Sequence, residues 1–249
     1  VTHFHGDHCL GLPGVIQRRA LDNRAASPAL GPLPVVFPAD GGEYFQRLRT
    51  ASAFHDTSEV HPVPVESDGS VLDLGPTANL SARRLDHRVP TFGYRIDEPD
   101  GIRLDADALA AFGIEGPDVG RLVRDGRLET SEGTIGVEQV SHHKPGQSMA
   151  FLMDTGLCSA AEELADGVDL LVCESTFLHA EVELAARFKH LTAQQAATIA
   201  RNAGARRLVL THFSARYSDS SVFGEEASSI HDDVVVADDL LIVPVPARL

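Results

Sequence analysis

The sequence predicts an α/β fold in which sheet layers are covered by helices. Short apolar runs recur along the chain, and small or polar residues close each run, as is typical of buried strands. A helical pattern covers residues 192–203, where Thr192 is placed as the N-cap and Gly204 stands just past the end. A strand pattern starts directly after Gly204, and this α-to-β unit favours sheets with helices on their faces.

The length and the β-branched content of five apolar runs indicate buried strands. They are "LPVVF" (33–37), "SMAFLM" (148–153), "VDLLVCE" (168–174), "RRLVLTHF" (206–213) and "DVVVADDLLIVPV" (233–245). No internal repeat is present. The stretch 97–132 is rich in Gly, Pro and charged residues, which favours an extended insertion over a domain boundary.

Composition narrows the classes of protein to which this chain can belong. It has 249 residues, 43% of them hydrophobic, enough for one large domain or two small ones. No apolar run approaches the roughly 18 residues that span a bilayer, and no signal peptide leads the chain, so no membrane association is expected. The three cysteines are an odd number without CxxC spacing, which disfavours a disulfide framework or thiolate zinc site and favours a reducing cytoplasm. The net charge of −15 argues against broad attraction to nucleic acid, so local basic groups or bound metal must hold any polyanion.

The first residues carry an unusual density of metal-binding side chains. "HFHGDH" spans residues 3–8. In an extended strand end, His3 and His5 point the same way and can bind one ion, and after a turn at Gly6 the side chains of Asp7 and His8 can face a second. Zinc accepts His nitrogen and Asp oxygen, and a hydrolytic zinc site keeps one position open for water. The alternative interpretation is a polar surface loop.

Three more donors follow apolar runs or stand in turn-like segments between them. His87 lies in "RLDHRVPTFGYR", Asp154 in "AFLMDTG" and His212 in "LVLTHFSARY". Ligand sites of open α/β sheets lie at the carboxyl ends of strands, where such residues meet. Taken singly, each has a plain structural explanation as a loop histidine, a turn-starting aspartate or a strand-end histidine.

The opening stretch resembles the HxHxDH signature of the metallo-β-lactamase fold, and the whole chain is similar to the ribonuclease Z family, endonucleases that trim tRNA 3′ ends. The segments that carry the resemblance, in family order, are "THFHGDHCLGLPG" (2–14), "HRVPTFGYRI" (87–96), the Asp-Thr of "LMDTG" (154–155), "LLVCESTF" (170–177), "HLTAQQAA" (190–197) and "LTHFSARY" (210–217). Met153 replaces the usual Gly before the aspartate, and Leu191 makes "HLT" of the family's "HST"; neither removes a ligand.

The resemblance implies a metallo-β-lactamase-type αββα sandwich as one domain over residues 1–249. The family has an N-terminal β-hairpin region before the HxHxDH strand, so an N-terminally incomplete sandwich starting at Val1 is expected. The segment at about 97–132 aligns with an inserted, tRNA-clamping arm. It holds ten acidic residues and four Arg. Of these, Arg121, Arg124 and Arg127 recur every three residues and could form a basic stripe on a helical turn; the alternative is a solvated acidic loop.

The resemblance also implies the roles of single residues. One zinc ion is expected on His3, His5 and His87, a second on Asp7, His8 and His212, and Asp154 would bridge the two ions. Asp7 would also accept a proton from the attacking water. His190 would protonate the leaving 3′-oxygen, with Glu174 as its orienting partner. The alternatives are a salt-bridged strand-end carboxylate for Glu174 and a helix-capping loop residue for His190. The remaining histidines are expected to be surface or structural residues.

The leading hypothesis is therefore a cytoplasmic, zinc-dependent endoribonuclease that binds two Zn²⁺ per chain. It would remove the 3′ trailer from precursor tRNA, leave a tRNA 3′-hydroxyl, and act as a homodimer. A second hypothesis is another hydrolase of the same fold, a small phosphodiesterase or arylsulfatase-like enzyme, which the acidic surface and weakly basic arm favour. A third is an inactive fragment that binds metal without turnover.

Overall fold

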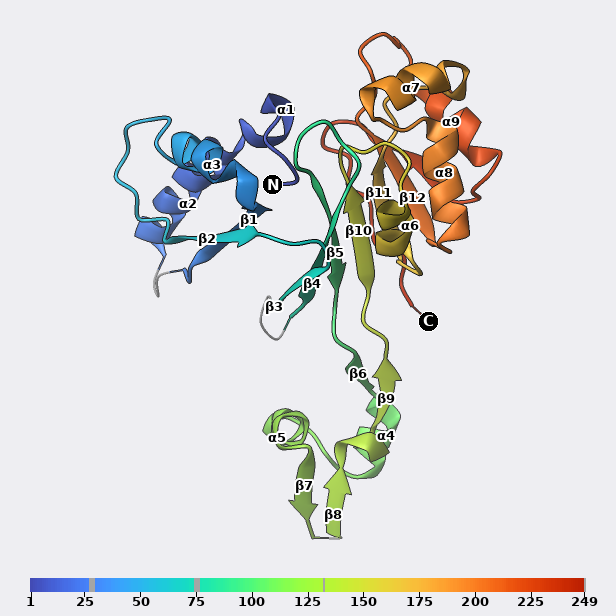
Figure 1. Ribbon diagram of the computed structural model, residues 1–249. Coiled ribbons are helices and arrows are strands. Elements are labelled where there is room, and N and C mark those ends of the chain that lie inside the picture. Colours follow the sequence, from blue (N-terminus) through green and yellow to red (C-terminus); the bar gives the residue numbers. More distant parts are fainter. Residues whose placement is uncertain (27–29, 74–76, 132, 249) are drawn as a thin grey trace. The chain divides into compact units, whose positions relative to one another are not determined.

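The computed structural model describes residues 1–26, 30–73, 77–131 and 133–248, and the chain divides into two compact units (Figure 1). The main unit consists of Val1–Asp97 and Ser148–Ala247. The inserted unit consists of Glu98–Gln147.

The main unit is built on a mixed sheet whose seven described strands run in the order β13-β12-β11-β10-β5-β4-β3. The strands are β3 (Ser70–Asp73), β4 (Asn79–Arg84), β5 (Phe92–Asp97), β10 (Ser148–Leu152), β11 (Leu170–Glu174), β12 (Arg207–Thr211) and β13 (Val234–Val236). Strands β10 to β13 are parallel, whereas β5 pairs antiparallel with both β10 and β4.

Helices α6 (Ser159–Ala165), α8 (Ala193–Asn202) and α9 (Ser221–Ser228) cover one face of this sheet (Figure 1). Their small Ala side chains let them approach strands that carry Leu152, Leu171 and Leu208, all fully buried. The α8 prediction is confirmed, since Thr192 caps the helix and exchanges side-chain hydrogen bonds with Gln195. Helix α7 (Val182–Phe188) precedes α8.

A second layered pair completes the main unit. Strands β1 (Leu33–Pro38) and β2 (Val60–Val65) pair in parallel and are covered by α2 (Leu12–Ala25) and α3 (Gly42–Arg49) through a core of Ile16, Val35, Phe37, Phe45 and Val60. On their other side, Val65 and Val36 pack with Leu80, Phe92 and Tyr94 of the large sheet. The order of layers is helix, sheet, sheet, helix, which confirms the predicted αββα arrangement.

Strand direction collects the predicted site residues at one edge of the large sheet. Because β10, β11 and β12 are parallel, their carboxyl ends meet there. The loop 85–91 between the antiparallel β4 and β5 lies at the same edge. The backbone oxygen of Thr2 accepts a hydrogen bond from the Phe92 amide at 3.0 Å, which brings the first residues of the chain to this edge as well.

Two details of the sequence interpretation are wrong. Within 233–245 only Val234–Val236 is a strand, and the side chains of Leu240 and Ile242 are 99% and 90% exposed. Here the last residues are held by Arg207, which donates to the Pro244 carbonyl at 3.0 Å, instead of by a strand ladder. The turn expected at Gly6 is a one-turn helix, α1 (Gly6–Cys9). None of the described helices is long and apolar enough to cross a membrane.

The inserted unit has its own small core, so the expected extended insertion is more compact than its composition indicates. Two antiparallel pairs, β6 (Gly101–Leu104) with β9 (Ser141–Lys144) and β7 (Arg127–Thr130) with β8 (Gly133–Gly136), accompany α4 (Ala106–Ala111) and α5 (Pro117–Asp125). The buried apolar side chains are Ile114, Leu122, Leu128, Ile135 and Val140. It stays a prediction that the chain is a single domain over residues 1–249 with an inserted arm at about 97–132.

The predicted stripe of three arginines on one helical turn is wrong. Gly126 adopts a left-handed conformation (φ 73°) that ends α5, so Arg127 belongs to β7. The other two side chains pair with neighbouring carboxylates, Arg121 with Asp118 and Arg124 with Asp125.

Candidate metal centre

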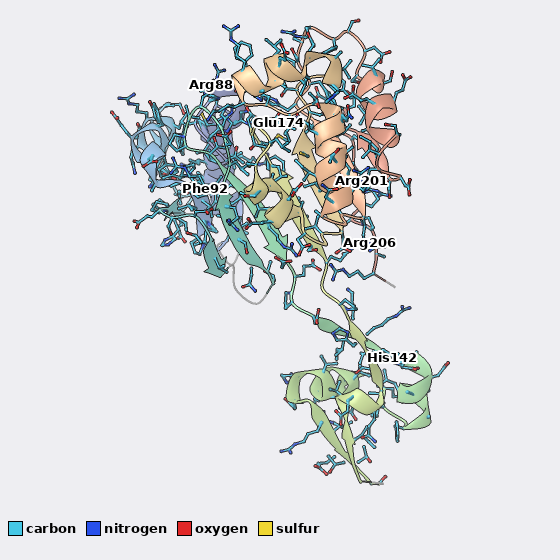
Figure 2. The ribbon with its side chains drawn as sticks, turned by 45° about the vertical axis from the view of Figure 1, so that its right-hand side comes forward. Arg88, Phe92, His142, Glu174, Arg201 and Arg206 are labelled. Atoms are coloured by element: carbon cyan, nitrogen blue, oxygen red, sulfur yellow. The ribbon has the colours of Figure 1, made fainter. Side chains whose placement is uncertain are left out.

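All seven predicted metal ligands lie together at the carboxyl edge of the large sheet. Their ligand atoms form two groups, His3, His5, His87 and Asp154 in one and Asp7, His8 and His212 in the other, each group with its atoms within 4.8 Å of one another. A third group that meets the same distance consists of Asp154, His190 and His212. Figure 2 shows Arg88 and Glu174 at this end of the main unit.

The Asp154 carboxylate stands between the two groups. One oxygen, Oδ2, lies 3.6 Å from Nε2 of His3 and 3.3 Å from Nε2 of His8. The other oxygen, Oδ1, lies 3.5 Å from Nε2 of His212. Asp154 is the second residue after β10, and only 2% of it is exposed. A carboxylate whose oxygens lie near imidazoles of both groups can bridge two ions.

Several polar atoms at the centre lack a suitable hydrogen-bond partner and are placed to bind a cation instead. Nε2 of His8 and Oδ1 of Asp154 are buried and have no hydrogen-bond partner among the described residues. Nε2 of His3 lies 3.0 Å from Nδ1 of His5, so two ring nitrogens face each other. Buried polar atoms normally have partners, and imidazole nitrogen with carboxylate oxygen is a donor set that zinc accepts. The residues present therefore fit a metal centre.

Burial and neighbouring charges keep His3, His87 and Asp154 in the forms that bind metal. Burial lowers the pKa of His3 to about 3 and also lowers that of His87, so both rings are neutral at pH 7. Burial alone would raise the pKa of Asp154, but its interactions with His8, His212 and His3 outweigh this and lower the value to about 2. Asp154 is therefore an anion beside the neutral rings of His3 and His87. Burial would lower the pKa of His8, but Asp154 and Asp7 more than offset this and raise it overall.

Hydrogen bonds from the second nitrogen orient two of the rings. Nδ1 of His87 lies 3.0 Å from the backbone oxygen of Lys189, to which it can only donate. Nδ1 of His212 lies 2.8 Å from Oγ1 of Thr176, whose own proton goes to Oε2 of Glu174 at 2.7 Å. In both rings Nε2 is left with its lone pair toward the centre, which is how metal-bound histidines are usually held.

Glu174 and His190 form a buried pair beside the ligands. Glu174 ends β11 with no exposure, and it accepts hydrogen bonds from the backbone amides of Thr155 at 2.7 Å and Leu191 at 3.1 Å. Its Oε1 lies 3.0 Å from Nδ1 of His190. Burial lowers the pKa of His190, but the hydrogen bond and charge of Glu174 more than offset this and raise it overall.

The helix-capping interpretation of His190 is wrong, because Thr192 caps α8. The ring of His190 instead lies near the ligands, with its centroid 5.2 Å from that of His87 and 5.5 Å from that of His212. Glu174 is a salt-bridged strand-end carboxylate, and its partner is His190. Glu174 and His190 therefore form one ion pair, which lies beside the metal-ligating histidines.

Asp7 is the most exposed of the seven residues. Its side chain is 66% exposed, and Oδ2 lies 3.2 Å from Nε2 of His8 and 3.5 Å from Nε2 of His212. Its small burial would raise the pKa, but His8, a backbone hydrogen bond and His212 lower it overall. The carboxylate is thus ionised and open to water.

The sequence interpretation missed Thr176, whose hydroxyl links Glu174 to a ligand histidine. The signal was its position two residues after Glu174 at the end of β11, within "ESTF". The other histidines take no part in this centre. For example, His142 and His143 pair with Asp105 and Asp100 within the inserted unit, and His231 is buried with Nε2 on the Ala205 carbonyl.

We expect Thr176→Val to weaken zinc binding by about 10–100-fold, because loss of such an outer hydrogen bond frees the ring of His212 to rotate. Valine keeps the shape of the side chain and removes only the hydroxyl. Competition with a chromophoric chelator measures the affinity. Thr176→Ser retains the hydroxyl and serves as the control; equal affinity of the Val and Ser variants would contradict the orienting role.

The chain resembles known proteins along its whole length. A model of the beta-lactamase superfamily domain matches residues 123–213. A ribonuclease Z from Salinispora arenicola is 51% identical over 249 residues, which cover 100% of this chain and 79% of that relative. A ribonuclease Z from Streptomyces coelicolor is 50% identical over 250 residues, which cover 100% of this chain and 80% of the relative.

Two solved structures share the fold at low sequence identity. The short form of human tRNase Z matches 99% of this chain and 78% of its own, with a TM-score of 0.60 and 23% identity. The metallo-beta-lactamase fold protein YhfI from Bacillus subtilis matches 95% of this chain and 72% of its own, with a TM-score of 0.62 and 17% identity. These matches agree with the αββα layers described above.

Proposed function

This chain belongs to the ribonuclease Z family, and on that premise we propose how its own residues remove the 3′ trailer from precursor tRNA. Ribonuclease Z is a hydrolytic endoribonuclease, and the reaction leaves a 3′-hydroxyl on the tRNA. The observation that carries the proposal is the cluster of seven donors around buried Asp154, with the Glu174–His190 pair beside it. A small phosphodiesterase or an arylsulfatase-like enzyme is not favoured, because relatives that match the full chain at about half identity are ribonucleases Z.

The metal content of the proposal is two Zn²⁺ per chain. His3, His5 and His87 would hold one ion, Asp7, His8 and His212 would hold the other, and Asp154 would supply oxygen to both. Support comes from the two groups of ligand atoms and from the partnerless Oδ1 of Asp154. When bound, such ions stabilise negative charge on a phosphodiester and lower the pKa of water toward about 7.

The remaining steps fall to the side chains. Asp7, exposed and ionised beside His8, orients the attacking water and accepts its proton. The bond between phosphorus and the ribose 3′-oxygen breaks, and this oxygen is a poor leaving group until it is protonated. His190 supplies that proton. Its Nδ1 donates to Glu174, so the ring is held in one orientation and its charged form is stabilised.

We propose that the inserted unit clamps tRNA, because it occupies the same place in the sequence as the tRNA-clamping arm of the family. Arg121 and Arg124 already pair with carboxylates, so clamping would draw on other contacts as well. We place the protein in the cytoplasm, as the three free cysteines favour, and expect it to act as a homodimer like the family it resembles.

Cleavage of a 3′-extended precursor tRNA tests the function. We expect one cut that releases the trailer and leaves a 3′-hydroxyl, blocked by a chelator and restored by zinc. A nitrophenyl phosphodiester measured beside it separates the competing hypotheses. Turnover of the small ester without tRNA cleavage would favour another hydrolase, and zinc binding without turnover of either substrate would favour an inactive fragment.

Zinc stoichiometry tests the metal proposal separately. We expect two zinc ions per chain at saturation, because seven nitrogen and oxygen donors surround two adjacent sites. Elemental analysis of the folded protein after removal of loosely bound metal gives the count. At most one ion at saturation would contradict the dinuclear centre.

A further inference from the structure

A pocket next to the metal centre has the chemistry of a nucleobase site. Its volume is about 410 Å³, and it is lined by Phe4, His5, Pro38, Asp40, Gly41, Tyr44, Val89 and Pro90. The lining segments are the start of the chain, the region from the end of β1 into α3, and the loop before β5 (Figure 1). His5 also belongs to the first group of metal-ligating residues, so the pocket adjoins the metal centre.

The aromatic rings of the pocket are held in place from behind. Tyr44 is 52% exposed and stacks on Phe4, with ring centroids 5.7 Å apart and planes inclined by 30°. Phe4 in turn meets the buried Phe37 edge to face at 6.0 Å. A Cβ at position 41 would clash with the Phe4 ring, so Gly41 is needed for this arrangement. The Tyr44 ring is thus supported by Phe4 and stays half exposed at the pocket.

The polar groups at the rim suit a heterocycle better than an aliphatic side chain. Asp40 is exposed and has no hydrogen-bond partner among the described residues, so its carboxylate can accept from an exocyclic amine of a base. The guanidinium of Arg47 lies 5.8 Å from the centroid of the Tyr44 ring. Aromatic platforms flanked by cations bind single-stranded nucleic acid through base stacking.

We propose that this pocket binds the base of the first trailer nucleotide, with Tyr44 as the stacking platform. The inference rests on the proposed function, since it takes a phosphodiester bound at the metal centre as given. The ribose whose 3′-oxygen leaves must lie against His190. Neither His190 nor Glu174 lines the pocket. The pocket therefore lies on the other side of the scissile phosphate, where the first nucleotide of the trailer is bound.

The test combines a change in the protein with a change in the substrate. Precursor tRNAs are prepared with either a normal or an abasic first trailer nucleotide. For the unchanged protein, we expect removal of the base to lower kcat/KM by about tenfold, within the range for stacking of one base on an aromatic ring. Tyr44→Ala should show the same loss with the normal substrate and no further loss with the abasic one.

Two variants control for indirect effects. Tyr44→Phe keeps the platform and should behave as the unchanged protein does, and Leu21→Ala removes an exposed apolar side chain (56% exposed) of α2 away from the pocket and should change nothing. Equal sensitivity of the unchanged protein and Tyr44→Ala to base removal would overturn the proposal, as would indifference of both.

A binding measurement separates this inference from the proposed function. The fluorescent base 2-aminopurine replaces the first trailer base, in an analogue whose scissile 3′-oxygen is a methylene group. We expect its fluorescence to be quenched on binding to the unchanged protein and to Tyr44→Phe, and much less on binding to Tyr44→Ala. Quenching that is equal in all three proteins overturns the base site even where tRNA is cleaved. Quenching that depends on Tyr44 supports it even where cleavage is absent.

Discussion

Asp154→Ala is expected to lower cleavage of precursor tRNA by more than about a thousandfold, further than alanine at any single histidine, because two bound ions contribute several kcal/mol to the transition state. Asp154 is the residue whose oxygens face both groups of imidazoles, Oδ2 toward His3 and His8 and Oδ1 toward His212. Its loss removes a ligand from both sites and the group that fixes their separation. Single-turnover cleavage with saturating zinc measures the effect.

The control for Asp154→Ala is Asp154→Asn, which keeps the size and burial of the side chain and removes its charge. Both variants should bind less zinc, and circular dichroism should show both folded, because Asp154 is not a member of either apolar core cluster of the main unit. Activity of Asp154→Ala within about tenfold of the parent, a change of only ~1.4 kcal/mol, would contradict the bridging role.

The donors of this centre could be predicted from the sequence because their positions are tied to strand ends. His212 follows β12 directly and Asp154 is the second residue after β10, and parallel neighbours bring such strand ends together. "HFHGDH" places four donors within six residues, so they stay close together in space whether the segment is a turn or a helix. The one-turn helix at Gly6–Cys9 replaced the expected turn without separating them.

Parts of the structure that depend on contacts distant in sequence could not be predicted in this way. The apolar pattern of 233–245 matches a buried strand, yet only three residues pair with β12, and the arginine contacts to Pro244, Pro246 and Ala247 are invisible in a local pattern. The inserted unit looked extended because its composition is charged. Its few apolar residues, such as Leu122 and Val140, nevertheless meet in space to form a core.

Thr176 illustrates the same limit within the centre. Its hydroxyl contacts Glu174, His190 and His212, which are spread over almost forty positions. A lone threonine after a strand has no chemical signature, and only the packing of β11 beside β12 reveals that it orients a ligand. The pairing of Glu174 with His190 likewise depends on the loop between α7 and α8 folding back over β11.

His190→Ala is expected to lower kcat for precursor tRNA by about 10²–10⁴-fold, the usual worth of general acid catalysis. Zinc content and tRNA affinity should stay nearly unchanged, because the proton is needed only in the transition state. A nitrophenyl phosphodiester has a good leaving group and barely needs that proton, so its cleavage should suffer much less. The ratio of the two losses is the measurement.

His179→Ala is the matched control, because it removes an exposed histidine from the segment just before α7. Among the described residues, this side chain contacts neither Glu174 nor the metal ligands. It should leave both substrates unaffected. His190 also lies within ligand distance of Asp154 and His212, so a drop in zinc content would assign it to the metal instead of the proton. Equal losses on precursor tRNA and the activated ester, with full zinc content, would contradict the acid role. A large loss on tRNA alone requires a proton delivered to the 3′-oxygen, and His190, held by Glu174 at 3.0 Å, is placed to deliver it.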